Sequence, residues 1–402
     1  MTPLMNRNVI RVAFLAATAL LATTACGADD VDTTDALVPP AGESEPLDDA
    51  PAAGDPDTGG PDGVVNGVVE VTPEYEWPAP MTPDDHYPVT VTSCSDEVTF
   101  RAPPERAVVN DDNMIEMMFA LGLTDRMAAY SAAKPRLRPV VFRDHYDAVD
   151  SLGDDYFALE PLLGADPDFV FSGWNYGFGE DGINPASLAE LGIPSYVLSE
   201  SCRRIDDTLA PATVDDIYRD IRALGDIFGV PERAEALIAH WDERLERVAD
   251  RLPAVTDPPA TLGFLRGADA AIVAPGLTIV PELHRLAGGR NVFEDVPAMW
   301  GPVSWEAVVE AAPEVIVVTD YGTAGEGQRG AEKIALLLDD PALADVPAIR
   351  EQRFLVFPQE AVNPGIGFIA GIEELAAELY PDEFADLIGS PGFGLPETYD
   401  LD

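Results

Sequence analysis

One sequence pattern occurs twice in this chain, 146 residues apart. Residues Leu159–Phe171 read LEPLLGADPDFVF, and residues Trp305–Val318 read WEAVVEAAPEVIVV. In each copy a glutamate begins an apolar helical turn, a proline follows seven residues later, and an acidic residue then precedes an apolar run typical of a buried strand. Solenoid proteins repeat every ~20–50 residues, so a spacing this long indicates a repeated domain. The pattern therefore predicts two lobes of similar construction.

Strands and helices alternate on both sides of this repeat. A buried strand at Ala107–Val109 is followed by a polar turn, an amphipathic helix that ends at Gly122, and a second short strand at Met127–Tyr130. Strand, helix and strand in so short a span predict a parallel unit with a right-handed crossover. The segments TLGFLRG, VIVVTD and RFLVFP repeat this order later in the chain. We expect an α/β fold with two Rossmann-like lobes, each built on a central, mostly parallel sheet.

A long helix is predicted between the two lobes. Pro231 begins the stretch PERAEALIAHWDERLERVADRLP, and the proline-rich segment PAVTDPP ends it. Proline suits the first helical position, and about twenty helical residues span ~30 Å. We expect this helix, over residues 230–253, to be a rigid connection between an N-terminal lobe of residues 85–229 and a C-terminal lobe of residues 254–402.

The first 26 residues look like a bacterial lipoprotein signal peptide. Arg7 and Arg11 precede the apolar run VAFLAATALLA, and TTAC ends the segment at Cys26. The apolar run is too short to cross a membrane as a stable helix. Thr23 stands where the lipoprotein pattern prefers leucine, so plain secretion is the alternative to acylation of Cys26. We expect a lipid-anchored protein on the extracellular face of the cell membrane.

Acidic residues dominate the chain. There are 72 Asp and Glu against 24 Lys and Arg, giving a formal charge of −48. Such a charge repels phosphate backbones and argues against a nucleic-acid partner. Residues 27–84 contain no Lys or Arg and are rich in Asp, Pro, Gly and Ala, so they cannot bury enough apolar surface to fold. We expect them to form a disordered linker.

Three cysteines are present, and lipidation would occupy Cys26. Cys94 and Cys202 would then be a pair in an oxidising compartment, where disulfides form. We predict a disulfide between them, whose closed loop of about 100 residues would contribute ~4.7 kcal/mol. Two buried free thiols or a metal-binding pair are the alternatives.

Several segments together carry a family resemblance. The chain resembles the extracellular substrate-binding proteins of ABC importers for ferric siderophores, haem and cobalamin, whose two lobes are joined by one long helix. The stretches that carry it are PPERAVVNDDNMIEMMFALGLTDRM, LEPLLGADPDFVFSG, LAELGIPSYVL, IRALGDIFGVPERAEALI, GGRNVFEDV, VSWEAVVEAAPEVIVVTD and IREQRFLVFP. The resemblance implies a monomer without a cofactor that delivers a small ligand to permease subunits.

The resemblance also gives a role to the repeated glutamates. In this family an exposed glutamate at a helix start in each lobe engages an arginine of the permease, and the matching positions here are Glu160 and Glu306. A carboxylate in the first turn of a helix is stabilised by the helix dipole, and its hydrogen bonds to arginine are short and directional. The alternative is that the two glutamates only stabilise their own helix N-termini.

The ligand cleft is expected where the strands end. Open α/β sheets bind ligands at the carboxyl ends of their strands. The candidate ligand-binding residues in the turns that follow are Asp112, Tyr130, Trp174, Tyr176, Arg266, Trp300 and Tyr321. Aromatic side chains on a glycine-rich loop suit a large flat ligand, although they could also pack against the lobe. Arg266 suits an anionic group on the ligand, or else a nearby acid.

Other classes of function are less well supported by the sequence. The four histidines are not placed to converge on a metal ion, so direct metal binding by the protein is not expected. The sequence has no GxSxG, Walker or HExxH motif and no Rossmann glycine fingerprint after Val109, which argues against an enzyme. We favour an iron-siderophore chelate as ligand. The alternatives are cobalamin, haem or another organic cofactor precursor, or a lipoprotein that recognises a partner without transport.

Overall fold

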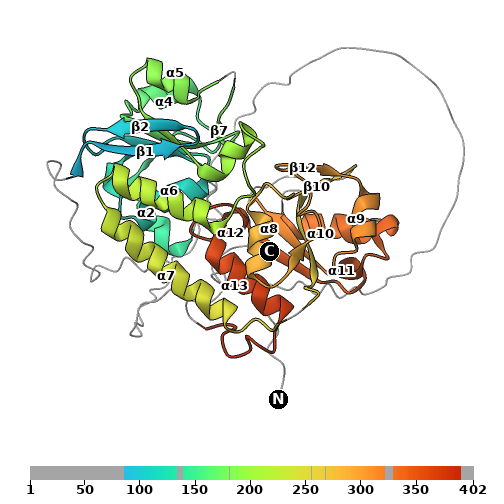
Figure 1. Cartoon of the computed structure of the whole chain (residues 1–402). Coiled ribbons are helices and arrows are strands. Elements are labelled where there is room, and N and C mark those ends of the chain that lie inside the picture. The colour runs from blue at the N-terminus through green and yellow to red at the C-terminus, as the bar shows by residue number, and fades with distance from the viewer. Residues whose placement is uncertain are drawn as a thin grey trace, which may run out of the picture. The chain divides into compact units, whose positions relative to one another are not determined.

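The computed structural model describes residues 86–133, 139–180, 182–254, 256–267, 269–321 and 329–390. The predicted signal peptide with Cys26, and the linker predicted over residues 27–84, lie outside these residues. Figure 1 shows the described elements coloured in chain order. Two six-stranded sheets follow one another along the chain, so the predicted α/β architecture of two lobes is confirmed.

The N-terminal lobe is built on a six-stranded sheet in the order β5-β4-β3-β6-β7, with β8 also paired to β6. Every pairing in this sheet is parallel. Its strands are β3 (Ala107–Asn110), β4 (Met127–Ser131), β5 (Asp150–Ser151), β6 (Phe169–Trp174), β7 (Gly177–Phe178) and β8 (Ser195–Val197). The central strands β3 and β6 are buried on both faces, which explains their continuous apolar sequences.

Helices connect these strands and continue the lobe after β8. They are α2 (Asp112–Ala120), η1 (Thr124–Arg126), η3 (Val140–Phe142), α3 (Arg143–Ala148), α4 (Leu159–Gly164), α5 (Pro185–Glu190), η4 (Ser199–Arg204) and α6 (Val214–Ile227). Thr213 begins α6 with a capping box, in which the Asp216 side chain accepts a hydrogen bond from the Thr213 backbone N–H at 3.0 Å.

The C-terminal lobe has a six-stranded mixed sheet in the order β12-β10-β9-β13-β14, with β11 also paired to β9. Its strands are β9 (Ala260–Arg266), β10 (Ala271–Val273), β11 (Arg290–Asn291), β12 (Gly301–Val303), β13 (Val315–Asp320) and β14 (Phe354–Pro358). Strands β9, β11, β13 and β14 pair in parallel, whereas β10 is antiparallel to both β9 and β12. The antiparallel edge follows from the short turn between β9 and β10, which leaves no room for a crossover helix.

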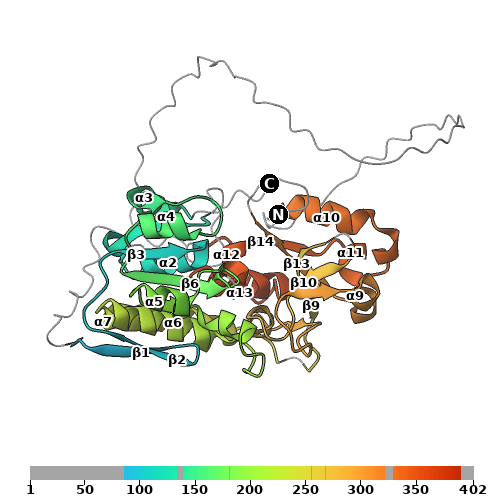
Figure 2. The same cartoon turned by 90° about the horizontal axis from the view of Figure 1, so that it is seen from above.

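The helices of this lobe lie in the second half of the chain, and Figure 2 shows the two sets of elements from above. They are α8 (Val280–Leu286), α9 (Trp305–Ala311), α10 (Gly330–Asp339), η5 (Pro341–Leu343), α11 (Pro347–Arg350), α12 (Gln359–Val362) and α13 (Phe368–Leu379). None of the helices in these described segments has the length and apolar character needed to cross a membrane.

The repeated sequence forms the same helix–strand unit in each lobe. It is α4 followed by β6 in the first copy and α9 followed by β13 in the second. In each copy, the carboxylate of the acidic residue after the proline accepts hydrogen bonds from backbone N–H groups at or just before the start of the neighbouring parallel strand. Asp168 accepts hydrogen bonds from the N–H groups of Glu105 and Arg106 at 2.8 and 2.9 Å, just before β3. Glu314 accepts one from the N–H of Ala260 at 3.2 Å, at the start of β9. The repeat therefore fixes the beginning of an adjacent strand.

The connecting helix α7 (Pro231–Ala249) begins at the predicted proline and lies against α6 and α13 (Figure 1). A continuous hydrophobic core extends from Phe169 of the first sheet through Trp241 of α7 to Ile372 of α13. Arg244 of α7 forms two hydrogen bonds with the carboxylate of Glu373 of α13, at 3.1 and 2.6 Å, and both side chains are buried. The helix is thus packed into both lobes along its length.

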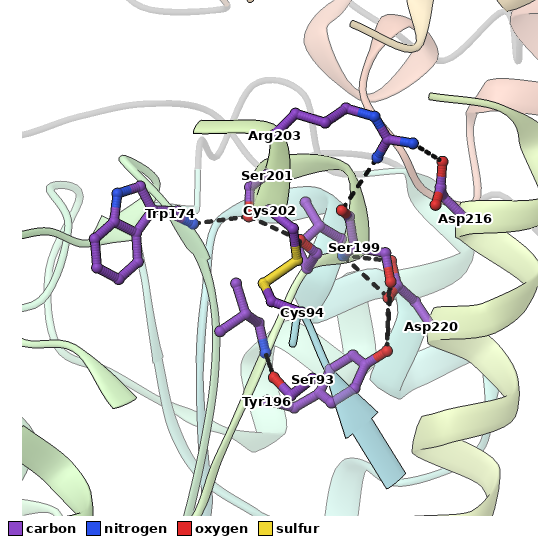
Figure 3. The surroundings of a disulfide bond; sticks show 12 residues. Ser93, Cys94, Trp174, Tyr196, Ser199, Ser201, Cys202, Arg203, Asp216 and Asp220 are labelled. Atoms are coloured by element: carbon purple, nitrogen blue, oxygen red, sulfur yellow. Dashed lines mark hydrogen bonds and ion pairs between the residues drawn. A yellow bond between two sulfur atoms is a disulfide. The ribbon is translucent and has the colours of Figure 1, made fainter. Parts of the chain in front are cut away.

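A hairpin at the start of the described chain, β1 (Val89–Ser93) and β2 (Asp96–Phe100), packs beside α6. The predicted disulfide is present and joins Cys94, in the hairpin turn, to Cys202 of η4 (Figure 3). The hydroxyl of Ser93 also accepts a hydrogen bond from the N–H of Val197 in β8 at 2.9 Å. The hairpin is therefore fixed covalently to the segment that leads from β8 into η4.

Candidate functional site

A cavity of about 560 Å³ lies between the two lobes. This volume is in the range of pockets that bind small molecules, about 300–1,000 Å³. The N-terminal lobe contributes Ala132, Asp154, Asp155, Tyr156, Tyr176 and Arg204. The C-terminal lobe contributes Leu265, Arg266, Ile272, Trp300, Gly301, Pro302, Thr319, Tyr321, Gln359, Val362 and Asn363.

The cavity lies at the strand ends, as the sequence predicted. Ala132 follows β4, and Tyr176 follows β6. In the other lobe, Arg266 is the last residue of β9, Tyr321 follows β13, and Gln359 follows β14. Because parallel strands end at the same sheet edge, these residues come together despite their separation in the sequence.

The phenol oxygen of Tyr176 connects the two lobes. It accepts one hydrogen bond from Nε1 of Trp300, at 2.9 Å, and another from Nη2 of Arg204, at 3.2 Å. The guanidinium of Arg204 also lies 5.1 Å from the centroid of the Tyr176 ring. Burial, and next the charge of Glu200, raise the pKa of Tyr176 above its ordinary value, so the phenol stays protonated. With both acceptor positions occupied, its own O–H can donate to a ligand.

On the C-terminal side, a buried lysine supports the cavity wall. Lys333 donates a hydrogen bond to the carbonyl of Thr319, and its ammonium lies 4.2 Å from the centroid of the Tyr321 ring. Burial lowers the pKa of Lys333 to about 8 and raises that of Tyr321 to about 12. The aromatic ring of Tyr321 therefore separates a buried positive charge from the cavity.

On the N-terminal side, a buried carboxylate lies behind the wall. Asp111, whose φ is 74°, accepts hydrogen bonds from Nε2 of Gln359 at 3.4 Å and from the hydroxyl of Tyr156 at 3.5 Å. The contact with Gln359 joins the residue that begins α2 in one lobe to α12 of the other, whereas the contact with Tyr156 is within the N-terminal lobe. Asp111 thus places negative charge close to two lining residues.

Glu200 of η4 makes a further contact between the lobes. Its Oε1 accepts a hydrogen bond from the N–H of Ile279, just before α8, at 3.1 Å. Its Oε2 is buried and has no hydrogen-bond partner in the part of the chain that the structure describes. Burial raises the pKa of Glu200 to about 7, although the Ile279 N–H and Arg204 act in the opposite direction.

Four of the seven predicted ligand-binding residues line the cavity: Tyr176, Arg266, Trp300 and Tyr321. The other three lie outside the lining. Asp112 is buried in α2, where its carboxylate accepts a hydrogen bond from the Tyr146 hydroxyl at 3.4 Å. The prediction for Asp112 assumed an open turn, but α2 begins there and turns the side chain into the lobe.

Tyr130 and Trp174 are used within the N-terminal lobe. Tyr130 is buried in β4, and its hydroxyl donates to the Tyr146 carbonyl at 3.5 Å. Trp174 is still part of β6 and packs against the apolar cluster on the outer side of that sheet. Its backbone N–H donates to the hydroxyl of Ser201 at 2.8 Å (Figure 3). Trp174 is the last residue of β6, whereas Tyr176 lies in the turn between β6 and β7, so the two side chains have different surroundings.

Several lining residues were not predicted from the sequence. They are Asp154, Asp155, Tyr156, Arg204, Gln359 and Asn363, together with smaller residues of the wall. Asp154, Asp155 and Tyr156 follow β5. Because this strand has only two residues, it shows no sequence period, and nothing in the sequence indicates a strand end there. Gln359 and Asn363 belong to the segment PQEAVNPG at the end of a strong strand, where the sequence predicts part of the cleft, although neither residue was singled out.

The two predicted docking glutamates occupy equivalent, exposed positions. Glu160 is the second residue of α4, and Glu306 is the second residue of α9. Ser304 caps α9 by accepting a hydrogen bond from the N–H of Ala307 at 3.2 Å. Hydrogen bonds from its own backbone N–H and from Ser304 lower the pKa of Glu306, so its carboxylate is charged at neutral pH.

Among the described residues, no group of three or more His, Cys, Asp or Glu side chains is arranged to hold a metal ion. Two lobes on a packed connecting helix, with a small-molecule cavity between their strand ends, define a ligand-binding protein of the two-lobe type. The chain belongs to the periplasmic binding protein family, whose pattern matches residues 108–361.

Comparisons with known proteins agree with this membership. The chain is 23% identical over 305 residues to the ABC transporter substrate-binding lipoprotein YvrC of Bacillus subtilis, covering 75% of this chain and 88% of that protein. It is 25% identical over 221 residues to the vitamin B12-binding protein of Photorhabdus laumondii, covering 54% and 72%. The crystal structure of an ABC-type Fe³⁺-hydroxamate transport system protein from Saccharomonospora viridis superimposes with a TM-score of 0.63 at 23% identity, covering 73% and 99%.

Proposed function

We propose that this protein captures an iron-siderophore-type chelate between its lobes and delivers it to the permease of an ABC importer. The proposal is carried by the cavity, to which both lobes contribute aromatic rings and charged groups at their strand ends. The rings of Tyr176, Trp300 and Tyr321 suit the organic body of a chelate, and the Tyr176 hydroxyl suits its oxygen acceptors. Membership of a family of transport binding proteins supports this function.

Delivery is proposed to depend on Glu160 and Glu306. They begin the two copies of the repeated helix–strand unit, so they offer similar carboxylates from both lobes. Since α7 and the continuous core hold the lobes together, the separation of the two carboxylates would change little between ligand-free and ligand-bound protein. A permease with one arginine for each lobe would recognise that fixed separation through ion pairs.

We further propose that acylation of Cys26 anchors a monomeric protein outside the cell, with residues 27–84 as a spacer. Ligand binding should then involve small lobe movements, because α7 is packed along both lobes rather than forming a hinge. Small-angle scattering of free and saturated protein tests this point. A radius of gyration that falls as much as in hinge-closing binding proteins would contradict it.

Two measurements test the main proposal. The first is tryptophan quenching on titration with a ferric trihydroxamate, haem and cobalamin, since Trp300 lines the cavity. Saturable binding of the trihydroxamate supports the proposed ligand. The second compares transport by wild type and by Glu160→Lys with Glu306→Lys. We expect the double variant to bind ligand normally but to lose transport, whereas Glu310→Lys, an exposed control on α9, retains it.

A related ligand remains an alternative for the same cavity. The relative from Photorhabdus laumondii is named as a vitamin B12-binding protein, so a corrinoid or another organic cofactor precursor would suit this chain's family. Saturable binding of cobalamin with no response to the trihydroxamate would favour this alternative. Binding of neither, by folded and disulfide-bonded protein, would favour partner recognition without transport.

A further inference from the structure

The charged groups that line the cavity are divided between the lobes. Asp154 and Asp155 are exposed on the N-terminal lobe, and Arg266 is exposed on the C-terminal lobe. None of these three side chains has a hydrogen-bond or ion-pair partner among the residues that the structure describes. Since charged side chains in a binding site are normally matched by their ligand, each wall is open to a group of opposite charge.

Buried groups behind the walls reinforce the same division. Behind the N-terminal wall, Asp111 contacts Tyr156 and Gln359. Behind the C-terminal wall, Lys333 lies against the ring of Tyr321, close enough to Arg266 for their charges to interact. The N-terminal wall is therefore the more negative one, and the C-terminal wall has two cations.

The remaining charges near the cavity do not reverse this polarity. Arg204 lies on the N-terminal side, but its guanidinium is held by the Tyr176 hydroxyl and lies near the buried carboxyl of Glu200. On the C-terminal side, Asp320 is paired with Arg329 at 3.3 Å and its charge also acts on Lys333, so Arg266 is the cation of this wall that has no carboxylate partner among the described residues. Glu360 of α12 adds a carboxyl on this side, but it is buried and does not line the cavity.

This inference rests on the proposed function. We infer that the ligand is a dipolar chelate with a net charge near zero, whose anionic group binds Arg266 and whose ammonium or clustered donor groups face Asp154 and Asp155. A polyanionic chelate, such as a ferric tris-catecholate, would place negative charge against the two aspartates. It would also be repelled on approach by a chain of formal charge −48. The aromatic rings between the two walls contact the uncharged middle of the ligand.

The test uses one ferric trihydroxamate core with different pendant groups: an ammonium, an uncharged acetamide, a carboxylate, or an ammonium together with a carboxylate. A ferric tris-catecholate is the polyanionic comparison. Affinities of the full mature protein are measured by fluorescence quenching. We expect the dipolar chelate to bind about a hundredfold more tightly than the acetamide, as two added ion pairs worth about tenfold each would give, and the tris-catecholate to bind most weakly.

Two variants assign the effect to the two walls. Arg266→Gln should lower affinity about tenfold for the carboxylate-bearing chelates and leave the ammonium chelate unchanged. Asp154→Asn with Asp155→Asn should lower affinity about tenfold for the ammonium-bearing chelates and leave the carboxylate chelate unchanged. Asp207→Asn and Arg290→Gln remove exposed charges that do not line the cavity and serve as matched controls. Thermal melts confirm that each variant is folded.

The outcomes separate this inference from the proposed function. If the tris-catecholate binds most tightly, or if the wall variants change all affinities equally, the dipolar ligand is refuted while chelate binding stands. If no iron complex binds to folded wild-type protein, the proposed function fails and this inference fails with it. If Arg266→Gln weakens only the carboxylate-bearing chelates, and the aspartate variant weakens only the ammonium-bearing chelates, the result supports both the dipolar ligand and the proposed function.

Discussion

Replacing Glu200 with glutamine should change how the stability of the protein depends on pH. The carboxyl is buried between the lobes, and its pKa is about 7 in the folded protein against an ordinary value of 4.5. Each pKa unit is worth about 1.36 kcal/mol, so this difference corresponds to about 3 kcal/mol. Because the folded protein binds this proton more tightly than the unfolded chain, the stabilisation is fully present below pH 4.5 and is lost as the pH rises through 7.

Urea unfolding of wild type and Glu200→Gln, at a series of pH values from about 4 to about 8, measures this contribution. Glutamine keeps an oxygen that can accept from the Ile279 N–H but cannot titrate. Asp220, whose pKa is also raised to about 7 by burial, is present in both proteins, so its contribution cancels in the comparison. We expect the free energy of unfolding of wild type, minus that of the variant, to fall by about 3 kcal/mol over this range.

A difference that stays constant with pH would refute this reasoning, since it would mean that Glu200 binds its proton equally in the folded and unfolded chain. Glu180→Gln is a suitable control because Glu180 is exposed on the loop after β7. Its difference from wild type should stay small at every pH. A large pH-dependent change in this control would show that the removal of any acid in so acidic a chain has the same effect.

Two further perturbations test the disulfide within the N-terminal lobe and the buried ion pair between α7 and α13. Cys94→Ser with Cys202→Ser should lower the free energy of unfolding, measured in urea, by up to ~4.7 kcal/mol, because the disulfide closes a loop of about 100 residues in the unfolded chain. A change below about 1 kcal/mol would contradict this. Arg244→Ala should cost about 3–5 kcal/mol because it leaves the carboxylate of Glu373 buried without its partner. Arg222→Ala, which breaks an exposed ion pair, should cost less than about 1 kcal/mol, and equal costs for the two arginines would contradict the role of burial.

Much of the fold could be predicted because its central strands are buried on both faces. The sequences of β6 and β13 are nearly continuous apolar runs, and Pro231 begins a long amphipathic helix, so each feature has a clear local signal. Strands of two residues, such as β5, have no period to detect. The antiparallel pairing of β10 with its neighbours also had no signal, because it depends on partners that are distant in the sequence.

The cavity was harder to predict than the fold. Tyr176, Trp300 and Tyr321 could be found because they follow strands or lie in loops with glycine and proline. Arg204 could not, because its place depends on η4, which is held by a disulfide and by buried hydrogen bonds. Trp174 was predicted to line the cleft because it is close to Tyr176 in the sequence. However, Trp174 is the last residue of β6, whereas Tyr176, two residues later, lies in a turn.

The continuous core along α7 has a consequence for how this protein folds. Because Phe169, Trp241 and Ile372 belong to one apolar cluster, neither lobe can complete its burial while the other is unfolded. Unfolding should therefore proceed as one cooperative transition rather than as two, which is unusual for a chain with two sheets. A lobe expressed alone would expose the apolar surface that α7 normally covers, and we expect it to aggregate.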